Sequence, residues 1–202
     1  MWIDRVKDVM AFEERMVAHA ISKVAEVHRE RIREVFGVEV AVPETPFPRI
    51  TMAKAQGSPA GRRLGPGGGE GDLDPDGERR IAAHMKEQTG HEFAFITHYP
   101  ASIRLFYHMR PAGRPDLTLS FDLLWKGMEV TTGAQCEHRS DVLLRQAEEK
   151  GMSTDPMQDY LNIFRFGCPP HGGLGRILMA MLGLDSIREA PFLFRGPNRL
   201  TP

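Results

Sequence analysis

The sequence predicts an α+β fold in which an antiparallel sheet is flanked by helices. Three observations lead to this prediction. The first 36 residues carry apolar side chains at helical spacing, and the middle of the chain alternates apolar and polar residues up to a tight turn. The last third contains two further helical stretches, each followed by glycine. Strands joined by short turns favour antiparallel pairing, and long helices packed on such a sheet give an α+β architecture.

Length and composition set the class of protein. The chain has 202 residues, enough for one domain over 1–202 with a sizeable core. The formal net charge is −1, so any nucleic-acid contact would need a local basic patch. Two cysteines do not make a disulfide framework and favour a reducing cytosol. No apolar run approaches 18 residues and no signal-peptide pattern begins the chain, so we expect a cytoplasmic protein without a membrane segment.

The first half of the chain is predicted to be mainly helical. Residues 4–36 form one long helix that ends at Gly37, and its many charges form a solvated face. Three prolines exclude a helix over 42–50, after which Thr51 caps a short helix. Residues 57–71 are rich in glycine but lack the Gly-Lys-Ser/Thr of a P-loop, so we expect a flexible loop. The pair Asp74-Pro75 begins a further helix that ends at Gly90.

The sheet is predicted from the residues that follow. Residues 93–97 and 103–109 are apolar and rich in β-formers, and 110–116 form a turn. Residues 120–135 read as a hairpin with its turn at Lys126-Gly127, and Leu117, Leu119 and Phe121 share one face.

Two helices follow the hairpin, over 140–150 and 155–166. Gly151 and Gly167 end them, and Ser153 or Thr154 caps the second. A loop over 168–173, a helix over 176–182 and a short strand over 191–194 complete the chain.

Two carboxylates on the hairpin are the clearest candidates for chemistry. Asp122 and Glu129 lie on opposite arms, and if they face the same way they form an acidic pocket. Two carboxylates so close do not both stay ionised easily without a cation, and Mg²⁺ held together with substrate phosphates suits them. The alternative is a pair of solvated acids on a surface hairpin.

The hairpin resembles the metal and ATP hairpin of class II aminoacyl-tRNA synthetases of the aspartyl/asparaginyl/lysyl group. That family has an Asp, six intervening residues, a Glu, and then a small residue followed by Gly, which here are Asp122, Glu129 and Thr132-Gly133. The resemblance extends through most of the chain. It includes residues 42–50, 95–100, 169–173, 183–189 and 195–202.

The resemblance implies a partial class II catalytic fold and an ATP-dependent ligase with Mg²⁺. Aspartate or asparagine would be activated to an adenylate and transferred to tRNA. A homodimer or a complementary N-terminal half is the implied partner.

The same resemblance implies roles for individual residues. Asp122 and Glu129 match the metal-binding acids, and Arg176 matches the arginine of the third signature motif, which meets the ATP phosphates. Arg176 and Glu129 are therefore the catalytic candidates, and both, with Asp122, are the ATP-binding candidates. The amino-acid pocket matches Thr132, Gly133, Gln135, Cys136, His171 and Gly172.

Three departures from the family pattern predict impaired activity. The first two signature motifs would precede Met1, and Cys136 stands where the family has an arginine that grips the substrate carboxylate. A neutral thiol does not replace a bidentate guanidinium. The step from Gly173 to Arg176 is about four positions shorter than in the family, which would displace Arg176 by roughly 6 Å along a helix.

Other interpretations stay open at this point. Cys136 and His138, with Cys168 and His171, have the residue types of a zinc site but not its usual spacing. A synthetase-like binding module without catalysis, or a free-standing relative that uses an activated amino acid for amide formation, would carry the same motifs.

Overall fold

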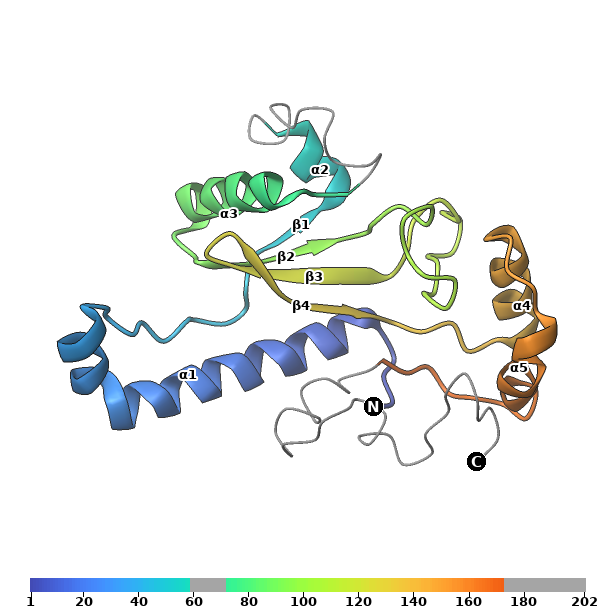
Figure 1. The fold of residues 1–202 in the computed structure, drawn as a ribbon, viewed down its shortest axis with the longest axis horizontal. Helices are drawn as coiled ribbons and strands as arrows, with labels where there is room; N and C mark the ends of the chain where they lie inside the picture. The colour runs from blue at the N-terminus through green and yellow to red at the C-terminus, as the bar shows by residue number, and fades with distance from the viewer. Residues whose placement is uncertain (59–71, 173–202) are drawn as a thin grey trace.

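The computed structural model describes residues 1–58 and 72–172. The predicted loop over 57–71 falls almost entirely outside these ranges, as do Arg176, the helix over 176–182 and the strand over 191–194. Within them, helices pack on both faces of a four-stranded sheet, which confirms the α+β class (Figure 1). The helices are α1 (Val6–Phe36), α2 (Met52–Gly57), α3 (Pro75–Thr89), α4 (Ser140–Glu149), the 3-10 helix η2 (Asp155–Met157) and α5 (Gln158–Phe164). The strands are β1 (Arg49–Thr51), β2 (Phe93–Thr97), β3 (Ser120–Trp125) and β4 (Met128–Ala134).

The predicted helix ends agree with the structure. Gly37 follows α1 at φ 66° and Gly90 follows α3 at φ 73°, both left-handed values that favour glycine. The Thr51 hydroxyl accepts from the Lys54 amide, and the Asp74 carboxylate accepts from the Gly77 amide. Thr154 precedes η2, but its side chain makes no capping hydrogen bond, so the predicted side-chain cap is absent there.

The sheet has the order β1-β2-β3-β4 and is mixed. The pairs β2–β3 and β3–β4 are antiparallel as expected, whereas β1 runs parallel to β2 and is a strand that the sequence pattern does not predict. A three-residue edge strand that follows a proline-rich segment leaves little periodicity to detect.

The predicted strand over 103–109 is wrong. These residues form turns, with one isolated bridge between His108 and Cys136. Gln146 of α4 takes two carbonyls that a strand ladder would otherwise use, and Lys150, which follows α4, takes two carbonyls just before this stretch. The Lys150 ammonium donates to the carbonyls of residues 101 and 102, and the Gln146 amide donates to those of residues 106 and 108. Tertiary contacts thus replace the ladder that the β-formers favoured.

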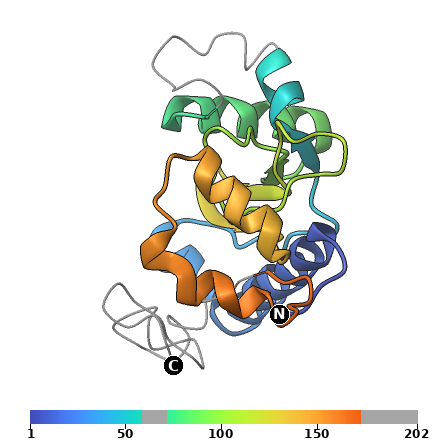
Figure 2. The same ribbon diagram turned by 90° about the vertical axis from the view of Figure 1, so that its right-hand side faces the viewer.

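Two hydrophobic cores lie on opposite faces of the sheet. Helix α1 runs beneath one face, and α2 and α3 cover the other (Figure 1). Seen from the side, α4 and α5 stack across the end of the sheet (Figure 2). The α1-side core contains Ile3, Val9, Met10, Phe47, Phe93, Phe95, Phe121 and Leu123. The α3-side core contains Met52, Ala55, Ile81, Ala82, Met85, Ala94, Ile96, Tyr99 and Leu124.

Candidate active site

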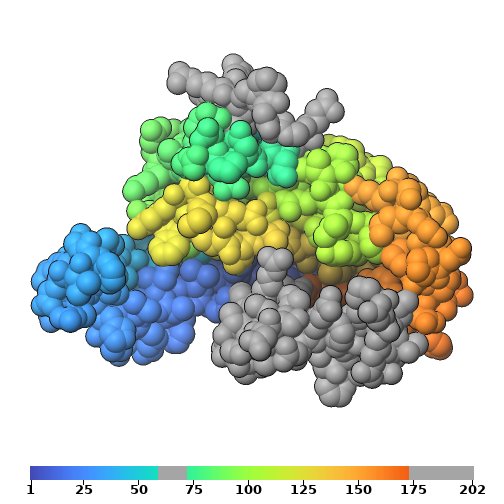
Figure 3. All heavy atoms as spheres, viewed as in Figure 1, coloured from blue at the N-terminus to red at the C-terminus, as the bar shows by residue number. Residues whose placement is uncertain are grey.

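The β3–β4 hairpin has the tight turn that the sequence predicts. Trp125 pairs with Met128, so Lys126 and Gly127 alone form the loop. Their φ angles of 52° and 84° are both positive, as a type I′ turn requires. Atoms of this hairpin reach the molecular surface between α3 and α1 (Figure 3).

A β-bulge sets which side chains face one another across the hairpin. Leu124 pairs with Glu129 but Leu123 pairs with Thr131, so Val130 is the extra residue. Beyond the bulge, Asp122 lies opposite Thr132. Residues directly opposite each other share a face, and so do positions i and i+2 of a strand. Asp122, Glu129 and Thr132 therefore face the α2–α3 side together.

Asp122 is buried and both of its carboxylate oxygens are engaged. It is only 4% exposed. Its Oδ1 accepts a 2.6 Å hydrogen bond from the Thr132 hydroxyl, and its Oδ2 forms an ion pair with the Arg104 guanidinium. That guanidinium lies over the Tyr99 ring, with 3.7 Å between Cζ and the ring centroid. Asp122 is thus a fixed carboxylate rather than a solvated one.

Glu129 is in the opposite situation. Its side chain is exposed, and within the described residues its carboxylate has no hydrogen-bond or ion-pair partner. Partial desolvation, together with the charges of Asp122 and Glu78, raises its pKa from 4.5 to about 7. Glu78 stands beside it, because the Glu78 Oε2 accepts a 3.1 Å hydrogen bond from the Glu129 amide. Desolvation and the charges of neighbouring acids also raise the pKa of Glu78.

This arrangement fits a divalent cation. Carboxylate oxygens are the ligands that Mg²⁺ prefers, and an open carboxylate with a raised pKa marks negative potential that nearby groups do not neutralise. The hypothesis of two independent solvated acids does not describe the hairpin, because Asp122 is buried and Glu129 senses its charge. Within the described ranges, no cluster of three or more His, Cys, Asp or Glu side chains has metal-site geometry, so a bound phosphate would need to supply further ligands.

The remaining candidate residues gather farther along β4 and just beyond it. Cys136 pairs with His171, and its amide donates to the His171 carbonyl at 2.8 Å. Gln135 is buried next to this pair. The imidazole of His171 lies 3.5 Å from the Cys168 sulfur, measured from Nδ1. Among the described residues, the zinc set of two cysteines and two histidines does not assemble as a metal cluster.

The two predicted glycines act through close packing. A Cβ at Gly133 would lie 2.4 Å from Cζ of Phe121, and one at Gly172 would lie 2.8 Å from the Ala134 carbonyl oxygen. Gly133 lies opposite Phe121, so it belongs to the α1 face rather than to the face of Asp122. Neither position has space for a larger residue.

The Cys136 thiol is neutral at physiological pH. Burial raises its pKa to about 11. The neighbouring His108 is also uncharged, since burial and the Arg104 charge lower its pKa to about 4. The position where the family pattern has an arginine therefore carries no positive charge from either residue.

Sequence reasoning missed Arg104, Tyr99 and Glu78. All three come from segments outside the hairpin, and the strand predicted over 103–109 gave Arg104 no defined direction. One signal was present: a single arginine in an otherwise apolar run, Ile103-Arg-Leu-Phe-Tyr107, indicates a buried charge that needs a carboxylate.

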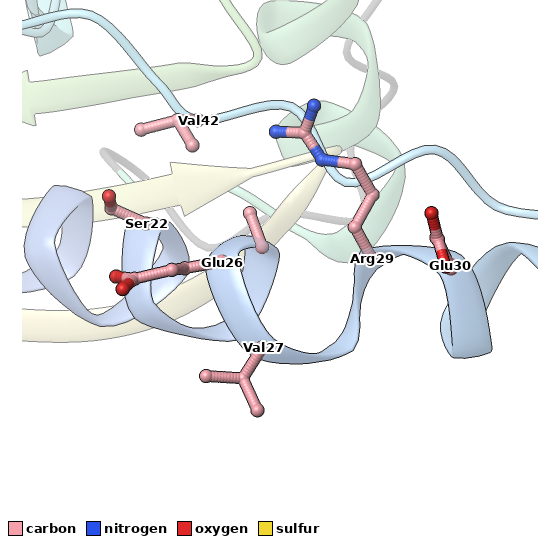
Figure 4. A pocket seen from close by; sticks show the side chains of 7 residues that line it. Ser22, Glu26, Val27, Arg29, Glu30 and Val42 are labelled. Carbon is pink, nitrogen blue, oxygen red and sulfur yellow. The ribbon is translucent and has the colours of Figure 1, made fainter.

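Two hollows lie away from this site. A groove of about 680 Å³ runs between the distal half of α1 and the returning segment at Val42, with Ser22, Glu26, Val27, Arg29 and Glu30 along it (Figure 4). A smaller pocket of about 230 Å³ lies near the start of α1, beside Arg49 and His98. Neither is lined by Asp122 or Glu129, and we place the candidate site at the hairpin because the paired acids are there.

Comparison with known proteins identifies the family. Residues 1–194 match the family model of class II tRNA synthetases (D, K and N). The chain belongs to this family. Aspartate–tRNA(Asp) ligase of Thermococcus kodakarensis is 38% identical over 209 residues, covering 100% of this chain and 46% of that protein. The chain therefore spans about half the length of that class II relative.

Solved class II structures agree with the fold. An aspartyl-tRNA synthetase from Entamoeba histolytica superposes with a TM-score of 0.76 at 28% identity, covering 100% of this chain and 43% of that one. The asparaginyl-tRNA synthetase of the same organism, in complex with asparaginyl-adenylate, gives a TM-score of 0.73 at 29% identity. It is covered over 47% of its length and this chain over 100%. No helix within the described residues is long and apolar enough to cross a membrane.

Proposed function

We propose that this chain is part of the catalytic domain of an aspartate– or asparagine–tRNA ligase. The reaction is ATP-dependent activation of the amino acid to an adenylate, followed by transfer to tRNA. The single observation that carries the proposal is the pair of acids on one sheet face of a class II fold. One of these acids is fixed and buried, and the other is open with a pKa of about 7. The relatives named above are ligases for aspartate or synthetases for aspartate and asparagine.

Each residue of the site has a separate role in the proposed reaction. Glu129 would hold Mg²⁺, with Asp122 behind it and the ATP phosphates as further ligands. When bound, the ion neutralises charge that develops on the phosphates. Arg176 is the proposed phosphate-binding cation, by its match to the third family motif. Positioning and electrostatic stabilisation are the main contributions of a protein to such a transfer.

The amino-acid pocket is proposed at Thr132, Gln135, Cys136 and His171, with Gly133 and Gly172 allowing close backbone packing. Because Cys136 and His108 are neutral, this pocket offers less to a side-chain carboxylate than the family pattern does. We expect aspartate to be held weakly, and asparagine to lose less from this replacement. A tRNA contact, a homodimer or a complementary N-terminal half, and a cytoplasmic location follow from the family and belong to the proposal.

The direct test is pyrophosphate exchange with the purified chain, Mg²⁺-ATP and either amino acid. Exchange that depends on aspartate or asparagine and that Glu129→Gln abolishes would support the ligase reaction. A parallel calorimetric titration with Mg²⁺-ATP reports binding without turnover. Failure to bind Mg²⁺-ATP at all would contradict the proposal.

A second function is favoured by the neutral thiol at position 136. A synthetase-like module that binds nucleotide without forming adenylate needs the acidic hairpin but not the carboxylate-binding arginine. A free-standing relative that uses an activated amino acid for amide formation would instead need the adenylate chemistry. Binding of Mg²⁺-ATP without exchange would favour the binding module. Exchange without transfer to tRNA would favour amide formation.

A further inference from the structure

Arg104 is the cation whose charge acts on both acids of the hairpin, and it forms an ion pair with only one of them. Its guanidinium pairs with Asp122 Oδ2, while Thr132 occupies Oδ1. The Arg104 side chain is 16% exposed and that of Asp122 is 5% exposed, so water screens this pair weakly. The Tyr99 ring lies against the guanidinium and fixes its position.

The consequence is an uneven division of charge within the site. Asp122 is neutralised by Arg104, and its oxygens are both in use. Glu129 and Glu78 have no ion-pair partner among the described residues, and both sense the charge of Asp122. A cation that enters from solvent therefore finds Glu129 open, while the charge of Arg104 opposes its binding.

We propose that Arg104 is a positioning residue that holds Asp122 away from the metal and makes divalent-cation binding depend on the nucleotide. This inference rests on the proposed Mg²⁺-ATP function. With Arg104 in place, one open glutamate and its neighbour bind a free ion weakly, and the phosphates of the nucleotide must complete the ligand set. Without Arg104, Asp122 becomes a second available carboxylate, and the site gains one unit of negative charge.

Charge arithmetic gives a prediction for four proteins. The Arg104–Asp122 pair contributes zero net charge in the wild type, −1 in Arg104→Met, +1 in Asp122→Asn, and zero in the double variant. Affinity for free Mn²⁺, used as a probe for Mg²⁺, should rise as this net charge becomes more negative. Arg104→Met should bind about tenfold or more tightly than wild type, the scale for a unit charge a few ångströms from a divalent ion under near-water screening.

The double variant separates charge from ligation. If Asp122 is not a ligand in the wild type, Arg104→Met with Asp122→Asn should bind Mn²⁺ about as well as wild type, and Asp122→Asn alone should bind more weakly. If Asp122 is a direct ligand, the double variant will bind far more weakly than wild type, and the proposal is overturned. An unchanged or weaker affinity in Arg104→Met overturns it as well.

The experiment is calorimetric titration of the 202-residue chain with Mn²⁺ at a pH above 7, without nucleotide and again with ATP. Arg110→Met is the matched control, because Arg110 is 20% exposed and pairs with Glu149 on α4 rather than with the hairpin. It should leave the Mn²⁺ affinity unchanged.

Two further measurements keep the test decisive. If Arg104→Met folds poorly, the thermal shift caused by Mn²⁺ replaces calorimetry and should exceed the wild-type shift, and an equal or smaller shift overturns the proposal. Wild-type protein that fails to bind Mn²⁺ even with ATP refutes the proposed function, and this inference with it. If the wild type binds Mn²⁺ with ATP but Arg104→Met does not raise the affinity for the free ion, the inference alone is refuted.

Discussion

At the scale of single residues, two acids of the same hairpin have different environments. Asp122 is buried between Thr132 and Arg104, whereas Glu129, one strand away on the same face, is open to solvent. Both residues carry a carboxylate, so the sequence alone does not reveal this difference. The contacts that produce it come largely from residues 99–104 and from α3.

The raised pKa of Glu129 predicts a pH-dependent stability. Its folded-state pKa of about 7 exceeds its ordinary value of 4.5, so in this window the folded chain holds a proton that the unfolded chain releases. The free energy of unfolding should therefore fall as pH rises from 4.5 to about 7. Glu129→Gln should be more stable than wild type at about pH 8 and similar at about pH 4, as measured by urea unfolding.

Mg²⁺ provides the control for this prediction. It should restore stability to the wild type at about pH 8 and should not affect Glu129→Gln, since the neutral amide is a poor ligand. Glu13 and Glu78 also have raised pKa values and remain in both proteins, so only the difference between the two proteins is informative. Parallel pH profiles for the two proteins would show that Glu129 does not titrate in this range.

At the scale of elements, the hairpin needs glycine at position 133 because of close packing, not because of a turn. Ala at position 133 would place its Cβ 2.4 Å from the Phe121 ring in the α1-side core. We expect Gly133→Ala to lower the free energy of unfolding by about 1–3 kcal/mol, because the ring has to move within a packed core. Gly57→Ala is the control. Its Cβ would meet no atom within 4 Å, so its stability should change by less than about 1 kcal/mol.

Helix α1 is amphipathic over its first half and exposes apolar side chains over its second. Val9 and Met10 are 1% exposed, whereas Val27 is 68% and Phe36 is 72% exposed. The distal half projects beyond the sheet (Figure 1), where the described residues provide no core for it. Apolar surface of this kind favours association with another chain, and we expect such association at the distal half of α1.

Substitutions along α1 test that expectation. Val27→Lys with Phe36→Lys should change the free energy of unfolding by less than about 0.5 kcal/mol and should reduce self-association in sedimentation velocity. Met10→Ala, in the proximal half, should instead cost about 2–5 kcal/mol. A wild-type chain that stays monomeric at high concentration would argue against the distal half as an association surface.

The elements that could be predicted from the sequence are those with local signals. Glycines indicated where α1 and α3 end, Asp74 indicated where α3 begins, and the Lys-Gly pair indicated the hairpin turn. The strand predicted over 103–109 failed because the Gln146 side chain takes the carbonyls of residues 106 and 108, a contact about 40 residues away in the chain. The pairing of Asp122 with Thr132 was also not predictable in detail, since it depends on a bulge at Val130 that carries no glycine signal.

At the scale of the whole molecule, the sequence patterns predicted the α+β class and the resemblance implied a partial class II catalytic fold, and the matched family and structures agree with both. Neither the parallel edge strand β1 nor the ion pair of Arg104 with Asp122 was predictable from the sequence. The resemblance assigns a role to each residue by its position in the sequence. The balance between the charges of Arg104, Asp122 and Glu129 depends on groups that meet only in the folded chain. The proposed ligase activity therefore depends on whether the charges at the hairpin suit Mg²⁺ and the ATP phosphates.

The last prediction is that the 202-residue chain, tested alone, forms aminoacyl adenylate far more slowly than its relatives. Two anion-binding contributions differ from the family pattern: Cys136 is neutral, and Arg176 lies about four positions nearer Gly173. A hydrogen bond to a charged group contributes about 1.5–3 kcal/mol, so losing two costs about 3–6 kcal/mol if they add. The rate should fall by about 10²- to 10⁴-fold, because each 1.36 kcal/mol is about tenfold.

Cys136→Arg should then raise pyrophosphate exchange with aspartate more than with asparagine, since only the carboxylate gains a bidentate partner. Exchange by the unmodified chain at the rate of a full-length relative measured alongside would contradict this prediction.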